Sequence, residues 1–161
     1  MAALATTSAL TAKNGGMDAR DAVDAVERAV AELVAALPAG VVVTEPDAVE
    51  KYRFDWTHDA RAGHPAAVVR AEDADHVVTT MRWASRHGIP VVPRGAGTGL
   101  SGGALAVDGG IMLSTERMRA VEIDVDARVA VVEPGALNGE GKRAAAEHGL
   151  WYPPDPSSFE M

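Results

Sequence analysis

Cysteine is absent from this 161-residue sequence, and aromatic side chains make up only 4% of it. The missing thiols exclude disulfides, thiolate nucleophiles, Cys-ligated zinc and iron–sulfur clusters. Since the sequence carries no mark of an oxidising compartment, we expect a cytoplasmic location. The apolar residues, 47% of the chain, are dominated by alanine and valine, whose small side chains suit close packing of helices on a sheet.

Positive charge and long apolar runs are also scarce. Lys and Arg total 15 against 23 Asp and Glu, which gives a formal charge of -8. Such a chain cannot neutralise a row of phosphates, so a nucleic-acid partner is not expected. No apolar run approaches the roughly 20 residues that cross a bilayer, so no transmembrane segment is expected either.

Residues 1–17 hold a stretch of Ala, Leu and Thr with no basic residue ahead of it, which is not the pattern of a signal peptide. We expect a disordered lead-in that ends near Gly15 and Gly16. The remaining residues, 18–161, are enough for one sizeable core and too few for two, which predicts a single domain.

Apolar periodicity and turn residues divide this domain into short elements. Helices are expected at 18–37, 73–88 and 136–148, a single turn at 47–52, and strands at 41–43, 65–69, 89–92, 111–113, 120–123 and 129–132. The helical spacing assigns Val34, Val78 and Met81 to the apolar faces of their helices. The strand, helix and strand between 65 and 92 have short connections, so we expect a parallel strand pair. The pattern predicts an α+β domain with a mixed sheet of short strands and flanking helices.

A glycine-dense loop, PRGAGTGLSGGA, runs from Pro93 to Ala104 directly after a predicted strand. Glycine lets the backbone take positive φ and brings its N–H groups within bonding distance of an anion, and Thr98 and Ser101 add hydroxyl donors. A flexible linker has a similar composition, but Pro93 and Arg94 fix the entry of this loop, and β-branched runs flank it. We therefore expect it to bind an anion such as a pyrophosphate.

Two other phosphate loops have to be compared with this one. A P-loop is excluded because no Lys-Ser or Lys-Thr pair follows the glycines. Gly97, Gly99 and Gly102 satisfy the spacing G-x-G-x-x-G of a dinucleotide fold, and Glu122 lies 20 residues further on. That fold needs a helix to begin inside the motif, and the later glycines leave no room for one. A nicotinamide nucleotide is thus the weaker alternative, which a helix starting within 97–103 would revive.

The other chemistry-bearing residues predict no catalytic or metal site. His58 and His64, with Asp55 and Asp59 nearby, match no common ligand spacing and are expected in a solvated loop. Tryptophan occurs three times and is expected in the core or at a domain interface rather than as a base-stacking platform, at Trp56, Trp83 and Trp151.

Two further segments, VEPGA at residues 132–136 and YPPDPSS at residues 152–158, give the sequence a family resemblance when taken with the glycine loop. From about Tyr52 onward, the chain resembles the flavin-binding domain of the vanillyl-alcohol oxidase/p-cresol methylhydroxylase (PCMH) superfamily. Within it, the chain is most similar to the FAD subunit of glycolate oxidase and to D-lactate dehydrogenases. The resemblance implies the amino-terminal part of a PCMH-type FAD-binding domain over 18–161.

The resemblance also implies which residues hold the cofactor. The glycine loop of the family wraps the FAD pyrophosphate, and the later segment supplies a second flavin contact. The residues so assigned are Pro93, Arg94, Gly95, Ala96, Gly97, Thr98, Gly99, Leu100, Ser101, Gly102, Gly103, Asp155, Ser157 and Ser158. Some relatives attach the flavin covalently through a histidine at the position of Thr98, so non-covalent FAD is implied here.

In the family, the chain continues into further strands and a separate substrate domain, and the catalytic residues lie there. The resemblance therefore implies no catalytic residue in this chain, which alone is expected to be inactive. For a full-length protein it implies oxidation of a 2-hydroxy acid such as glycolate or D-lactate, with other oxidase subunits as further partners. The alternative is a truncated, non-catalytic remnant that no longer binds flavin.

Overall fold

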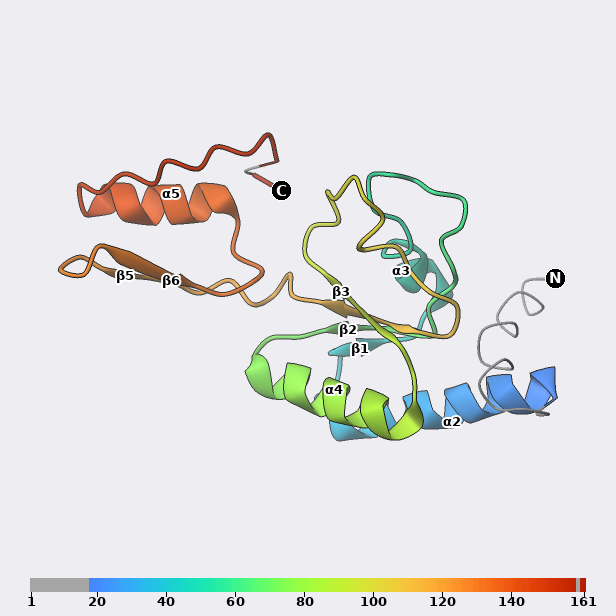
Figure 1. Ribbon diagram of the computed structural model, residues 1–161. Helices are drawn as coiled ribbons and strands as arrows, with labels where there is room; N and C mark the ends of the chain where they lie inside the picture. The colour runs from blue at the N-terminus through green and yellow to red at the C-terminus, as the bar shows by residue number, and fades with distance from the viewer. Residues whose placement is uncertain (1–17, 159) are drawn as a thin grey trace.

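The computed structural model describes residues 18–158 and 160–161, so the expected disordered lead-in at 1–17 lies outside the described residues. The elements follow the predicted order along the chain (Figure 1). They are α2 (Ala19–Ala36), β1 (Val42–Val43), α3 (Pro46–Glu50), β2 (Ala67–Arg70), α4 (Ala74–His87), β3 (Val91–Arg94), β4 (Ile111–Ser114), β5 (Val121–Asp124), β6 (Val129–Val132) and α5 (Asn138–Glu147).

The main sheet has four strands in the order β1-β2-β4-β3. Strand β1 is antiparallel to β2, whereas β2 and β3 each pair in parallel with β4, which confirms a mixed sheet. The expected direct pairing of β2 with β3 is wrong, because β4 lies between them. All four residues of β4 are buried, and a short strand without a polar position belongs at the centre of a sheet covered on both faces.

Strands β5 and β6 form a separate antiparallel hairpin beside the mixed sheet. The Asp124 carboxylate accepts a hydrogen bond of 2.8 Å from the Ala127 N–H, and Arg128 takes a positive φ of 54°. Helix α5 packs against this hairpin, away from the main sheet (Figure 1). The residues of β6 are nevertheless exposed.

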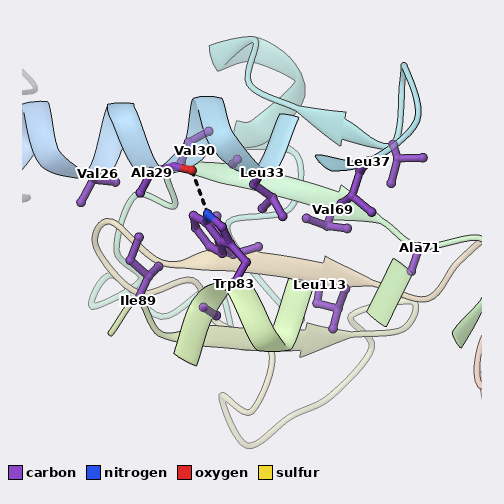
Figure 2. Packing of buried hydrophobic residues seen from close by; sticks show 14 of the residues in the cluster. Val26, Ala29, Val30, Leu33, Leu37, Val69, Ala71, Trp83, Ile89 and Leu113 are labelled. Atoms are coloured by element: carbon purple, nitrogen blue, oxygen red, sulfur yellow. Dashed lines mark hydrogen bonds between the residues drawn. The ribbon is translucent and has the colours of Figure 1, made fainter. Parts of the chain in front are cut away.

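The core lies between the main sheet and the pair of helices α2 and α4 (Figure 1). Leu33 and Trp83 are almost fully buried, and the Trp83 Nε1–H donates to the Ala29 carbonyl at 2.8 Å (Figure 2). Because side chains alternate across a strand, Val68 and Met112 face the other side, where Val49 of α3 packs.

Three residues that the helical spacing assigns to apolar faces are exposed, namely Val34, Val78 and Met81. On α4 the buried position is taken by Thr80 instead, whose hydroxyl donates to the His76 carbonyl at 2.8 Å. A threonine that satisfies its hydroxyl within its own helix can turn its methyl group to the core.

The three tryptophans differ in burial. Trp83 lies in the core as predicted, whereas Trp151 is 84% exposed and Trp56 is 47% exposed. Neither of these two belongs to the core of the described chain. Among residues 18–158 and 160–161, no helix combines the length and the apolar character needed to cross a membrane.

Candidate functional site

The three parallel strands of the main sheet end side by side. Arg70 of β2 and Arg94 of β3 are both in register with Ser114 of β4. The glycine loop leaves this edge at the end of β3. In sheets with parallel strands, ligands bind at the carboxyl ends of the strands, so the fold places the loop where a ligand site is expected.

The backbone of the loop has donors to spare. Within the part of the chain that the structure describes, no N–H group from Gly95 to Ala104 donates to a backbone carbonyl. Gly97 and Gly102 take positive φ values of 74° and 76°. A run of N–H groups without backbone acceptors on glycine-dense backbone is an anion-binding arrangement, and the last of them, at Ala104, is directed to the Asp55 carboxylate. No helix starts between Gly95 and Gly110, so the context that a dinucleotide fold needs is missing.

Arg94 lies on the underside of this loop. Its Nη1 donates to the Phe54 carbonyl at 2.8 Å and reaches the Ala104 carbonyl at 3.5 Å. A Cβ built on Gly97 would lie only 2.1 Å from Nη2 of Arg94, so the loop closes over the guanidinium only with glycine at 97. Burial lowers the pKa of Arg94, and the negative charge of Asp55 opposes this shift.

Asp55 also lies beneath the loop and is only 2% exposed. Its Oδ1 accepts bonds from the N–H and the hydroxyl of Thr57, at 3.0 and 2.5 Å. Its Oδ2 is buried without a partner and lies 4.0 Å from a Cβ built on Gly99. The hydrogen bond from the Thr57 hydroxyl is the main reason why the pKa of Asp55 lies below its usual value.

The expectation that Asp55 belongs to a solvated loop is therefore wrong. The next residue ties the same turn to the loop, since the Trp56 N–H donates to the Gly97 carbonyl at 3.1 Å. Among the described residues, no group of three or more His, Asp or Glu converges as metal ligands do. The polar sequence around Asp55 looks like that of a surface turn. The only indication that Asp55 belongs to the site is that the family resemblance begins near this residue.

A second polar cluster lies at the same edge of the sheet. The Tyr52 hydroxyl donates to Oε1 of Glu116 at 2.8 Å, and Nε of Arg70 donates to the same oxygen. The Arg94 guanidinium lies 5.9 Å from the centre of the Tyr52 ring. Burial and the bond to Glu116 raise the pKa of Tyr52. Burial acts to raise the pKa of Glu116, but the bonds from Tyr52 and Arg70 outweigh it and the pKa is lowered.

The lowered pKa of Glu116 gives a prediction for acid stability. Below its ordinary value of 4.5 the unfolded chain takes up the proton first, so folded-state stability is lost as pH falls. We expect the melting temperature of the natural protein to fall more steeply between about pH 5 and pH 3 than that of Glu116→Gln. Thermal melts followed by circular dichroism across this range measure the difference. Glu147→Gln, at an exposed position of α5, serves as control and should keep the natural slope.

The second segment assigned to the flavin lies apart from the loop. Asp155 and Ser157 are exposed and Ser158 is half-buried, in the stretch that runs back along α5 (Figure 1). Lys142 of α5 forms an ion pair with Asp155. Within the described residues, no hydrogen bond or ion pair joins 155–158 to residues 93–103. The structure does not bring the two predicted parts of the site together.

A cavity of about 580 Å³ lies elsewhere, along α2. It is lined by Val23, Val26 and Val30 of that helix and by the segment around His64, and by no residue of the glycine loop. Most residues of the glycine loop are exposed, so the loop presents its donors at the surface.

Comparison with known proteins places this arrangement in a family. Residues 65–161 match the family described as FAD binding domain. A D-lactate dehydrogenase from Archaeoglobus fulgidus is 41% identical over 112 residues, which cover 68% of this chain and 25% of that protein. The glycolate oxidase subunit GlcD of Bacillus subtilis is 36% identical over 113 residues, which cover 68% of this chain and 24% of that protein. The chain spans about a quarter of the length of these curated relatives.

Solved structures agree. The fold is similar to that of p-cresol methylhydroxylase with substrate bound, with a TM-score of 0.69 and 25% identity over 85% of this chain and 26% of that one. Alkyldihydroxyacetonephosphate synthase gives a TM-score of 0.72 at 19% identity, over 83% of this chain and 27% of the other, a likeness of fold alone. The family match covers more than half of the sequence and confirms the resemblance predicted from its motifs. The chain therefore belongs to the family of FAD binding domains, of the PCMH-type fold, with FAD as its cofactor.

Proposed function

We propose that residues 93–103 hold the pyrophosphate of FAD without a covalent bond. The observation that carries this proposal is the run of N–H groups from Gly95 to Ala104 that donate to no backbone carbonyl, at the carboxyl edge of the sheet. The exposed N–H groups of this run are open to water or to a ligand, and those of buried or half-buried residues such as Gly97 and Gly102 need an acceptor, because buried backbone donors are nearly always paired. A pyrophosphate supplies several acceptor oxygens.

The residues present fit this cofactor. Gly97 is buried directly above Arg94, whose positive charge lies beneath the anion site. The hydroxyls of Thr98 and Ser101 are available as further donors, and hydrogen bonds to a charged group contribute about 1.5–3 kcal/mol each. The side chains of Asp155, Ser157 and Ser158 form the second contact in this proposal, which requires 155–158 and the cofactor to meet.

For the whole protein we propose a 2-hydroxy acid as substrate class, because the relatives are named D-lactate dehydrogenase and glycolate oxidase subunit. The word subunit in the second name supports other polypeptides as partners. When bound, FAD supplies the two-electron oxidising chemistry. The share of this chain is to bind and orient the cofactor. A cytoplasmic location stays a prediction, supported by the cysteine-free sequence.

The test is the visible spectrum of the purified 161-residue chain, followed by titration with FAD at fixed salt. Saturable quenching of flavin fluorescence at one FAD per chain is expected. We also expect no turnover of glycolate or D-lactate with an artificial electron acceptor, and measurable turnover would contradict the assignment of a binding role alone. A colourless chain that does not bind FAD in the titration would favour the alternative, a non-catalytic remnant that has lost flavin binding.

A further inference from the structure

Two charged side chains lie near each other at the glycine loop, although they form no ion pair with each other among the described residues. Arg94 is half-buried under Gly97, and Asp55 is 2% exposed under Gly99. Burying one charge without a partner costs several kcal/mol, so buried charges are almost always paired. The negative charge of Asp55 opposes the fall in the pKa of Arg94, and the charge of Arg94 helps to lower the pKa of Asp55.

The two groups interact through their charges rather than through a hydrogen bond. The Oδ2 of Asp55 is buried without a hydrogen bond of ordinary length, and the backbone N–H of Ala104 helps to lower the pKa of this carboxyl. Nη1 of Arg94 donates to two carbonyls, whereas its Nη2 and Nε have no acceptor among the described residues and are not buried. Thr57 occupies Oδ1 and thereby fixes which oxygen of Asp55 stays free.

We propose that Asp55 is a positioning residue of the anion site, whose carboxylate keeps the Arg94 guanidinium on the underside of the glycine loop. This rests on the proposed function of the loop as the pyrophosphate site. An anion above the loop attracts the guanidinium upward, and Asp55 supplies the opposing attraction from below. The guanidinium then stays bonded to the carbonyls of Phe54 and Ala104, and the N–H groups of the loop face the ligand.

The charge of Asp55 also keeps the site balanced. A carboxylate this close beneath an anion site would repel a pyrophosphate if it stood alone. With Arg94 nearby, the two charges largely offset each other, so binding depends mainly on the backbone donors. Asp55→Asn releases the guanidinium from its place under the loop and Arg94→Met removes it, so the two changes should have overlapping effects.

The test uses the 161-residue chain with Asp55→Asn, Arg94→Met and the double variant. We expect each single change to weaken FAD binding about tenfold and the double variant to be no weaker than either single one, because both act through one pair. Effects that multiply fully in the double variant would overturn the proposal. Asp59→Asn is the matched control in the same segment, where the carboxylate pairs with Arg61, and it should leave FAD binding unchanged.

A second readout does not depend on FAD. In the natural protein the side-chain Nε–H signal of Arg94 in a ¹⁵N NMR spectrum should be separate from those of solvated arginines. We expect it to join them in Asp55→Asn and to stay separate in Thr57→Val, which removes a hydrogen bond but keeps the charge. An unchanged Arg94 signal in Asp55→Asn would refute the pairing.

If Asp55→Asn does not fold, the interaction is tested by substituting Arg94 and measuring the pKa of Asp55. In Arg94→Met the pKa of the Asp55 carboxyl, followed by ¹³C NMR, should rise but stay below its ordinary value of 3.8, because Thr57 still donates to it; an unmoved pKa would count against the proposal. Failure of all proteins to bind FAD would remove the proposed function from this chain, while the NMR measurements would still decide whether Asp55 holds Arg94.

Discussion

Replacing Gly97 with alanine is expected to weaken FAD binding by about tenfold to a hundredfold, because a non-glycine residue in the left-handed region costs about 1–3 kcal/mol and about 1.4 kcal/mol is a factor of ten. Gly97 has a φ of 74°, and its new Cβ would lie 2.1 Å from Nη2 of Arg94. The loop and the guanidinium beneath it cannot both keep their places. Titration of FAD by fluorescence quenching measures the loss.

Gly141→Ala, in α5 and outside the loop, is the control. Its φ is not positive, and a Cβ there meets no atom within 4 Å, so the backbone keeps its conformation. We expect a dissociation constant within about threefold of the natural one, since changes that meet no such feature stay within about 0.5 kcal/mol. Equal losses in the two variants would mean that the conformation at Gly97 does not decide affinity.

Gly135→Ala is expected to lower the free energy of unfolding by about 3 kcal/mol, at the upper end of what overpacking usually costs. A Cβ on Gly135 would lie 1.9 Å from the Thr115 carbonyl oxygen and 2.7 Å from that of Met118. Both are backbone atoms that cannot rotate away, and the Gly135 N–H already donates to Met118 at 2.8 Å. This contact joins the segment after β4 to the segment after β6.

The measurement is urea unfolding followed by circular dichroism, with a fall in melting temperature of about 6–12 °C as the parallel readout. Gly141→Ala in α5, where a Cβ meets no atom within 4 Å, is the control and should be neutral or slightly stabilising, because alanine favours a helix over glycine. A Gly135→Ala variant as stable as the control would show that the two segments separate freely.

Local pattern predicted most of the elements. The α4 helix begins where Asp73 accepts a hydrogen bond from the His76 N–H at 2.9 Å, and it ends at Gly88 with a φ of 64°, as capping residues indicate. Strand partners were harder to predict, because β-branched runs look alike wherever they lie in a sheet. The sequence therefore predicted strands 65–69 and 89–92 but not that 111–114 separates them.

The candidate site was likewise predictable only in part. The glycine spacing predicts the loop, because glycine readily takes the backbone angles and allows the close approach found at Gly97. No local pattern predicts which residues lie beneath the loop, because Asp55 and Arg94 are 39 positions apart in the sequence and come near each other only in the folded chain. The family resemblance implies that Arg94 contacts the cofactor, and in the structure its hydrogen bonds go to the carbonyls of Phe54 and Ala104.

The place of β4 has a consequence for how the chain assembles. The strand at the middle of the parallel set is the last of the three to be made on the ribosome, and within the described residues β3 pairs with β4 alone. Until residues 111–114 have emerged, α2, α4 and β2 can gather only around an incomplete sheet with β3 unattached. Pairing between segments far apart in sequence is slow, because the chain between them must first be closed into a loop. The glycine loop lies in the chain between β3 and β4, so the loop becomes closed in the same step in which β4 completes the sheet.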